Sequence, residues 1–159
     1  TVLGKDTSFH CMPQGLQKAL AGYIERGGRL LLSGAYIASD MQSQEDKAFI
    51  SSTLHYGLSC THASKSGRLQ TASLLPTGVY TFRTEPNDEC IHTENPDGLR
   101  AVGDGARCVA RYEDTGVGAG VAYIEPEEGG AKTLCWSFMM ESAQDFETLY
   151  TDCVDWLMQ

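Results

Sequence analysis

The sequence predicts an α/β fold in which helices cover both faces of a mainly parallel sheet. Two observations carry this prediction: an apolar run, RLLLSG at 29–34, of the kind found in buried parallel strands, and helical periodicity of apolar residues on either side of it. A third is the series of strand-like segments separated by short turns after residue 105, which adds β-hairpins. Helices on both sides of such a sheet give a three-layer arrangement.

The first helix is expected over 15–26, between Pro13 and the glycine pair at 27–28. Its apolar residues recur at i, i+3, i+4, i+7 and i+8, which places on one face Leu16, Ala19, Leu20, Tyr23 and Ile24. The strand 29–33 that follows should be central in the sheet and parallel to its neighbours, because it is apolar throughout.

A second helix should begin at Ser43, where Asp46 three residues later completes a capping box. The strand-like pattern of the segment 58–105 is interrupted by many turn residues, and GVYTFRTEP is one strand candidate within it. Three further strands are expected in RCVARYED, GAGVAYIEP and AKTLCWSFMM. The apolar stripe of 144–158 predicts a final helix packed against the sheet.

Composition narrows the function classes. The chain of 159 residues suits a single domain over 1–159. Its net charge of -9 argues against nucleic acid as a partner, and without a run of eighteen apolar residues no membrane span is expected. The opening TVLGKD reads as a strand already under way, so we expect the C-terminal part of a longer protein. GVGAG at 116–120 lacks the dinucleotide-binding pattern, and no cofactor is expected.

The six cysteines predict no metal site, because none forms a Cys-x-x-Cys pair and no histidine pair completes a zinc spacing. We expect mostly buried free thiols, with one or two disulfides left open as an alternative. His10 and Cys11 are adjacent, and adjacent side chains diverge, so a working Cys–His pair is not expected there.

A ligand is expected at the end of the strand 29–33, because α/β sheets bind ligands at the carboxyl ends of their strands. The candidate ligand-binding residues are Ser33, Gly34, Tyr36, Ser39 and Asp40. For catalysis the candidates are Ser33 as nucleophile and Asp40 with Glu141 as a carboxylate pair at two strand ends. The alternative for both carboxylates is capping of the helices that follow them.

Three stretches resemble a class I glutamine amidotransferase-like domain: LQKALAGYIERGGRLLLSGAYIASDM, ARCVARYEDTGVGAGVAYIE and KTLCWSFMMESAQDFETLYTDCVDWL. More narrowly, they look like the terminal domain of secreted bacterial proteins that bear the name xanthan lyase. The resemblance implies a flavodoxin-like fold. It also puts Ala35 in the place of the catalytic cysteine and Met139 in the place of the histidine, with only Glu141 matching the motif.

The resemblance therefore implies a catalytically silent module of an extracytoplasmic protein that handles polysaccharide or cell wall. The module would bind a carbohydrate or small molecule, or pack against neighbouring domains of the same chain. Two alternatives stay open. One is a hydrolase or polysaccharide-active enzyme of the xanthan lyase type with a site at Ser33, Asp40 and Glu141, and the other is a purely structural oligomerisation domain.

Overall fold

The computed structural model describes residues 10–86, 91–127 and 129–159. Along the chain the elements are α1 (Gln14–Ile24), β1 (Arg29–Ser33), α2 (Gln44–Ser52), β2 (Tyr56–Cys60), β3 (Arg68–Thr71), β4 (Val79–Thr81), β5 (Gly98–Ala101), β6 (Ala106–Tyr112), β7 (Gly118–Ile124), β8 (Lys132–Trp136), a 3-10 turn η1 (Met140–Ser142) and α3 (Phe146–Met158). The helices, the strand at 29–33 and the hairpin strands are thus close to their predicted positions.

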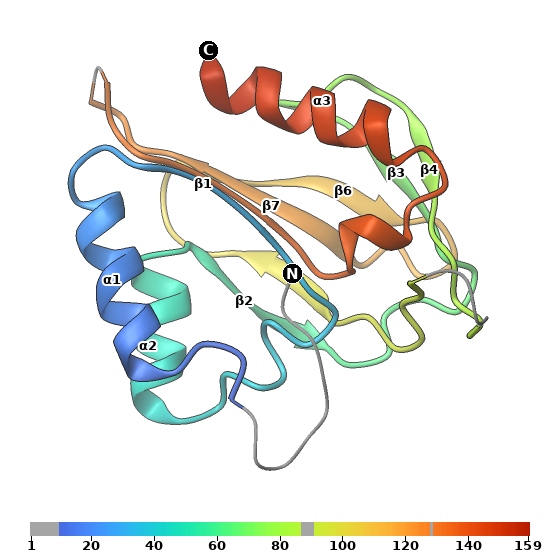
Figure 1. The fold of residues 1–159 in the computed structure, drawn as a ribbon, viewed down its shortest axis with the longest axis horizontal. Helices are drawn as coiled ribbons and strands as arrows, with labels where there is room; N and C mark the ends of the chain where they lie inside the picture. Colours follow the sequence, from blue (N-terminus) through green and yellow to red (C-terminus); the bar gives the residue numbers. More distant parts are fainter. Residues whose placement is uncertain (1–9, 87–90, 128) are drawn as a thin grey trace.

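The eight strands found in the described residues belong to one sheet, whose main path runs β1-β8-β7-β6-β3-β4. β7 also pairs with β5, and β5 with β2, so the sheet branches at β7 and curls into a half-barrel (Figure 1). Of the strand pairs among the described residues, only β1 and β8 run parallel, and the others are antiparallel.

The predicted flavodoxin-like fold with its mostly parallel sheet is therefore wrong. β6, β7 and β8 follow one another through the short connections 113–117 and 125–131, and connections of that length join antiparallel strands. The position predicted for 29–33 is wrong as well. Within the described part of the chain β1 pairs only with β8 and lies at the sheet edge, although that one pairing is parallel.

Two apolar cores lie on opposite faces of the sheet. Along β8, Leu134 and Trp136 face the core that includes α3, whereas Cys135 between them faces the core that includes α1 and α2. This alternation follows from the two-residue period of a strand, and Figure 1 shows the helices on the two sides accordingly. Burial on both faces explains why β7 is apolar along its length and why β8 is apolar from Leu134 to Trp136.

The second helix begins as predicted. The Ser43 hydroxyl accepts from the amide of Asp46 at 3.1 Å, and the Asp46 carboxylate accepts from the amide of Ser43 at 3.3 Å. The cysteines also behave largely as expected, because those described are free: Cys11, Cys60, Cys108, Cys135 and Cys153. Cys90 lies outside the described residues.

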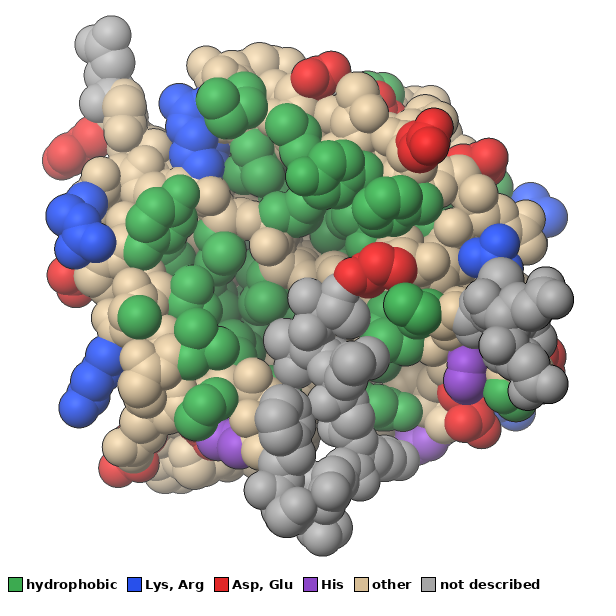
Figure 2. Space-filling model, viewed as in Figure 1, with side chains coloured by type: hydrophobic (Ala, Val, Ile, Leu, Met, Phe, Trp, Pro, Cys, Tyr) green, Lys and Arg blue, Asp and Glu red, His purple; other side chains and the backbone are tan. Residues whose placement is uncertain are grey.

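Several large apolar side chains remain exposed on α1 and α3: Leu16, Tyr23, Phe146, Tyr150 and Met158. Figure 2 shows apolar side chains gathered on the face of the molecule between these helices. A contiguous apolar area of this kind is typical of surfaces that contact another protein part. No helix within the described ranges combines the length and the apolar character that crossing a membrane requires.

Candidate functional site

The loop that follows β1 is fixed from inside the protein. Ile37 and Met41 are fully buried, and the fully buried Tyr56 donates its hydroxyl to the carbonyl of Ile37 at 2.9 Å. The amide of Asp40 donates to the carbonyl of Tyr36 at 3.1 Å, which closes a turn. Tyr36, Ser39 and Asp40 are thereby held at the surface between buried neighbours.

Asp97, just before β5, anchors this loop. Its Oδ2 accepts from the amides of Ala38 at 3.0 Å and Ser39 at 2.8 Å, and its own amide donates to the carbonyl of Ala35 at 2.9 Å. The residue is only 1% exposed, and its second oxygen, Oδ1, is buried with no hydrogen-bond partner among the described residues. Burial raises the pKa of Asp97, and the hydrogen bonds from Ser39 and Ala38 oppose that rise without cancelling it.

A cavity of about 200 Å³ opens beside this anchor. Its walls come from the loop after β1, the loop after β2 and the segment before β5, and they consist of Tyr36, Ser39, Asp40, Thr61, His62, Asn95 and Asp97. The backbone of His62 has a φ of 55°, a left-handed conformation that residues other than glycine seldom adopt. The amide of the next residue, Ala63, donates to the carbonyl of Pro96 at 2.8 Å, which ties the two loops together.

The aromatic wall of the cavity is Tyr36. Burial raises the pKa of its hydroxyl, the negative charges of Glu94 and Asp97 raise it further, and a hydrogen bond with Asn95 opposes them. Tyr36 is consequently a neutral phenol at ordinary pH, with a ring surface next to polar groups. This combination of one ring with hydroxyl, amide and carboxylate groups suits a ligand that has both an apolar face and hydroxyls.

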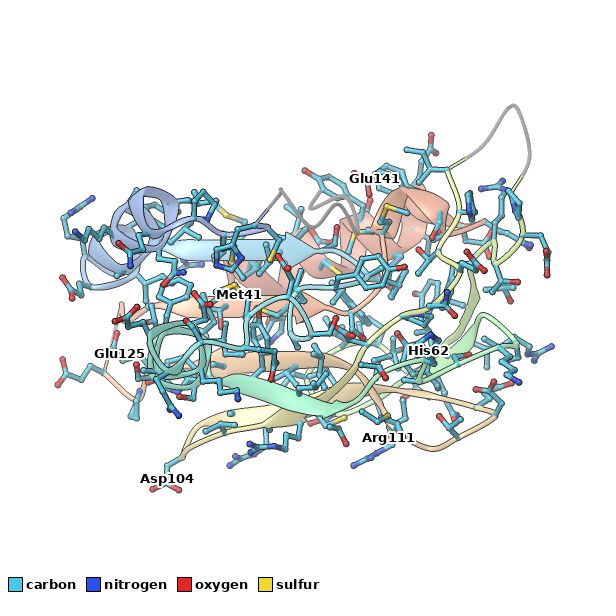
Figure 3. All side chains as sticks on the ribbon, turned by 90° about the horizontal axis from the view of Figure 1, so that it is seen from below. Met41, His62, Asp104, Arg111, Glu125 and Glu141 are labelled. Carbon is cyan, nitrogen blue, oxygen red and sulfur yellow. The ribbon has the colours of Figure 1, made fainter. Side chains whose placement is uncertain are left out.

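Of the predicted site residues, the structure brings together Tyr36, Ser39 and Asp40. Ser33 ends β1 opposite Trp136, and the buried Gly34 donates its amide to the carbonyl of Trp136 at 3.1 Å, so both lie outside the walls of the cavity. Glu141 lies in η1 beside α3, apart from His62 of the cavity (Figure 3).

The capping alternatives for the two carboxylates are not what the structure contains. Ser43, not Asp40, caps α2. The N-cap residue of α3 is Asp145, and Glu141 instead has a buried Oε2 with no hydrogen-bond partner within the described residues. The catalytic roles suggested for Ser33, Asp40 and Glu141 stay predictions.

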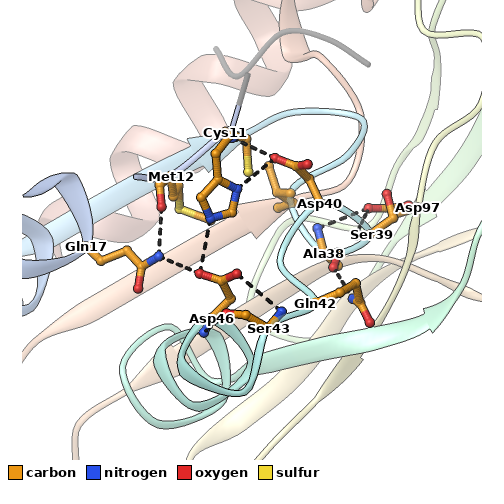
Figure 4. A network of polar contacts seen from close by, with 12 residues as sticks. Cys11, Met12, Gln17, Ala38, Ser39, Asp40, Gln42, Ser43, Asp46 and Asp97 are labelled. Carbon is orange, nitrogen blue, oxygen red and sulfur yellow. Dashed lines mark hydrogen bonds and ion pairs between the residues drawn. The ribbon is translucent and has the colours of Figure 1, made fainter. Parts of the chain in front are cut away.

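A polar network adjoins the cavity and shares Asp40 with it (Figure 4). Asp40 Oδ2 accepts from the amide of Cys11 at 2.6 Å and lies 3.2 Å from His10 Nδ1, while His10 Nε2 lies 3.1 Å from Asp46 Oδ1. Gln17 donates to the same Asp46 oxygen at 2.7 Å. The ligand atoms of His10, Cys11 and Asp40 all lie within 4.8 Å of one another, so these three residues could hold a metal ion.

The network shifts the acidity of its members. Burial alone would lower the pKa of His10, but hydrogen bonds and charge from Asp46 and Asp40 outweigh it, and the pKa is raised. Burial would raise the pKa of Asp46, yet hydrogen bonds from Ser43, Gln17 and His10 lower it. Burial, followed by the hydrogen bond and charge of Asp40, raises the pKa of Cys11 to about 12.

Several residues of the site were not anticipated, and Asp97 and His10 are the most important of them. Asp97 lies in the turn-rich TENPDGLR, where an aspartate is ordinarily a turn former, and nothing local reveals that it is buried. His10 was set aside because adjacent side chains diverge, whereas in the structure both His10 and Cys11 reach the same third residue, Asp40. The contact between His10 and Asp40 joins residues that are 30 positions apart, so no local sequence pattern reveals it.

No known family model matches the chain, and no curated protein matches it by sequence. Solved structures that share its fold include the following two. One is the exo-beta-1,4-mannosidase Op5Man5 from Opitutaceae bacterium strain TAV5, with a TM-score of 0.50 and 14% identity over 91% of this chain and 22% of that chain. The other is a beta-galactosidase from Bacillus circulans sp. alkalophilus, with a TM-score of 0.58 and 12% identity over 89% of this chain and 20% of that chain.

The predicted resemblance to glutamine amidotransferases is therefore wrong. Structures that share the fold include a mannosidase and a galactosidase, and the sheet is a curled, largely antiparallel one. A nucleophile elbow also passes from strand to helix in one sharp turn, whereas residues 34–43 separate β1 from α2. Ala35 and Met139 thus lose their assignment as vacated catalytic positions. The chain spans about a fifth of each of these glycosidases.

Proposed function

We propose that this chain is an accessory domain of a larger carbohydrate-active protein and that its cavity binds a single sugar residue. The domain would present Asp97 and Asp40 to sugar hydroxyls and the Tyr36 ring to the apolar face of the sugar. The parent protein would work outside the cytoplasm, where polysaccharide and cell-wall material are met.

The observation that carries the proposal is the unpaired Oδ1 of Asp97. A buried polar atom without a partner costs about 1–3 kcal/mol, so proteins seldom retain one without a use. The atom belongs to a residue in the cavity wall, and a ligand hydroxyl that donates to it would remove the cost. Because Oδ2 already accepts two backbone amides, the carboxylate is held in place before a ligand arrives.

The size and lining of the cavity agree with a sugar. At about 200 Å³ it is smaller than the pockets that hold drug-sized molecules, which are roughly 300–1,000 Å³. Its remaining walls supply the hydroxyls of Ser39 and Thr61, the amide of Asn95 and the imidazole of His62. A ligand with several hydroxyls around one ring matches this set of donors and acceptors.

The structural likenesses support the carbohydrate context. The two solved chains described above are named as glycosidases, and in each the matching part is about a fifth of the chain. A domain that makes up about a fifth of its chain acts together with other domains. The exposed apolar side chains of α1 and α3 would provide a surface for one of them.

The test is a titration with mannose, galactose, glucose and xylose, followed by NMR chemical-shift changes. Asp97→Asn keeps an oxygen for the two amides but turns the unpaired oxygen into a donor, so we expect affinity to fall at least about tenfold, as for a lost charged hydrogen bond. Asp114→Asn is the matched control, because Asp114 also accepts two backbone amides, from Lys65 and Ser66, but does not line the cavity. No binding of any sugar, or equal binding by Asp97→Asn, would refute the proposal.

One observation favours a second function, hydrolysis of a glycosidic bond. Glycosidases use two carboxyl groups, one of which is protonated by virtue of a raised pKa. Asp97, with its raised pKa, and the more exposed Asp40 line the same cavity. Release of nitrophenol from aryl mannosides and galactosides, abolished by Asp40→Asn or Asp97→Asn and unchanged in Asp114→Asn, would establish it. Absence of release from every aryl glycoside would leave binding alone.

A further inference from the structure

Three side chains of types that commonly bind metal ions converge next to the proposed sugar-binding cavity. His10 and Cys11 precede α1, and Asp40 ends the loop after β1, so the cluster joins two segments far apart in the chain. The nearest ligand atoms of the three lie within 4.8 Å of one another. Cys11 is buried, whereas the side chains of His10 and Asp40 are 37% and 30% exposed, so the cluster is open to solvent on one side.

The histidine is oriented from behind, as metal-binding histidines usually are. Asp46 Oδ1 lies 3.1 Å from His10 Nε2, on the side of the ring away from Asp40, and Nδ1 is thereby turned toward Asp40. A carboxylate on the far nitrogen of a ligating histidine is a recurrent outer partner in zinc proteins.

Asp46 is itself immobilised. Gln17 donates to its Oδ1 at 2.7 Å and to the carbonyl of Met12 at 2.7 Å, and the amide of Ser43 donates to its Oδ2 (Figure 4). The capping box of α2 and the start of α1 therefore hold the carboxylate that orients His10. This order extends well beyond what a surface ion pair requires.

We propose that His10 Nδ1, Cys11 Sγ and the Asp40 carboxylate bind one divalent transition-metal ion of the zinc type, with Asp46 as the outer partner of His10. One thiolate, one imidazole and one carboxylate suit zinc, cobalt or nickel, and they do not suit calcium or magnesium, which bind through oxygen alone. On binding, Cys11 forms its bond to the metal as a thiolate and its proton passes to solvent.

The spacing fits such an ion after a small contraction. Zinc bonds of about 2.0–2.3 Å place tetrahedral ligand atoms roughly 3.3–3.8 Å apart. The three ligand atoms already lie within 4.8 Å of one another before any ion draws them together, and the side chains of His10 and Asp40 are partly exposed, which leaves room for a small shift on the solvent side. Three protein ligands leave a fourth position for water or another small ligand.

Asp40 belongs to both the metal cluster and the cavity wall, so the two sites are coupled. A cation on Asp40 neutralises one of the two carboxylates that line the cavity and withdraws an acceptor from the sugar. Metal should therefore change sugar affinity, and sugar should change metal affinity by the same factor. This coupling rests on the proposed sugar site, whereas the metal site itself does not.

The test uses cobalt as the probe on chelator-stripped, reduced protein. We expect one equivalent of Co²⁺ to bind with a thiolate-to-cobalt charge-transfer absorption in the near ultraviolet, and Zn²⁺ to displace it. Cys11→Ser should abolish the band and lower metal affinity by more than about 100-fold, and Asp46→Asn should lower it by about 10–100-fold through the misoriented histidine. Cys153→Ser is the control, since Cys153 is also buried but lies in α3 in the other core.

Absence of the band in the wild-type protein, or its persistence in Cys11→Ser, would overturn the metal site and leave His10 as a polar link between Asp40 and Asp46. Circular dichroism of each variant separates loss of a metal ligand from loss of the fold. His10→Gln is a second variant, in which the thiol is intact. If it binds Co²⁺ with the wild-type affinity and the same absorption band, the proposal is also overturned. Sugar titrations in the presence of chelator report on the cavity independently, so failure of one proposal is distinguishable from failure of the other.

Discussion

Asp97 offers the sharpest test of how the site is built, because only one of two substitutions there should destabilise the protein. Asp97→Ala removes the acceptor of two backbone amides. Ala38 is fully buried, so its amide loses its partner out of reach of water, at about 1–3 kcal/mol, while Ser39 is partly exposed and its amide loses about 1 kcal/mol. The free energy of unfolding should fall by about 2–3 kcal/mol, since removal of a buried carboxylate returns part of the loss.

Asp97→Asn should instead be as stable as the wild type near neutral pH, or more stable. The amide oxygen still accepts the two backbone amides, and no charge is buried. The sign follows from the raised pKa: the folded state binds the proton of Asp97 more tightly than the unfolded state, so wild-type stability declines as the pH rises above about 3.8 and through the folded pKa. Asp97→Asn lacks that decline.

The assay is urea unfolding and thermal melting by circular dichroism between pH 4 and pH 8. A loss of 2–3 kcal/mol corresponds to a fall in Tm of about 4–12 °C for a domain of this size. If Asp97→Asn melts at as low a temperature as Asp97→Ala at pH 7, the hydrogen bonds that the Asp97 side-chain oxygen accepts from the two backbone amides do not hold the loop.

Three further predictions follow from local contacts. Ser43→Ala removes the capping box of α2 and should cost about 1 kcal/mol in urea unfolding, whereas an unchanged midpoint would show that the cap contributes nothing. Gly120→Ala would bring a Cβ within 2.8 Å of the buried Trp136 ring and should cost about 1–3 kcal/mol, which a melt as high as the wild type would contradict. His10 has a raised pKa, so the stability that it contributes is fully present below pH 6.5 and is lost as the pH rises through the folded pKa. In the presence of a chelator, His10→Gln should flatten this decline in stability. An equally steep decline in the variant would assign the decline to another group.

Helices and the hairpin strands could be read from the sequence because their signals are local. The i, i+3, i+4 stripe of α1, the Ser43–Asp46 capping box and the turns after Tyr112 and Ile124 each lie within one element or one connection. By contrast, β2, β3 and β5 lie in the segment that looked irregular. Their partners include β5, β6 and β7, and the residues of one strand do not reveal which other strand it pairs with.

The candidate site divides in the same way. The prediction that a ligand lies after the strand 29–33 stays a prediction, and the structure shows a cavity there with Tyr36, Ser39 and Asp40 in its walls. The prediction rested on a parallel sheet, however, and the cavity owes its shape to loops that meet through Asp97.

By itself, the sequence determined where the chain forms helices, where β1 and the hairpin strands lie and which faces are apolar, because these depend on the spacing of neighbouring residues. Only the tertiary structure decided strand direction, the edge position of β1, the buried carboxylate of Asp97 and the meeting of His10 and Cys11 with Asp40. Those features depend on which distant segments bury one another, and burial is a property of the packed chain, not of any window along it.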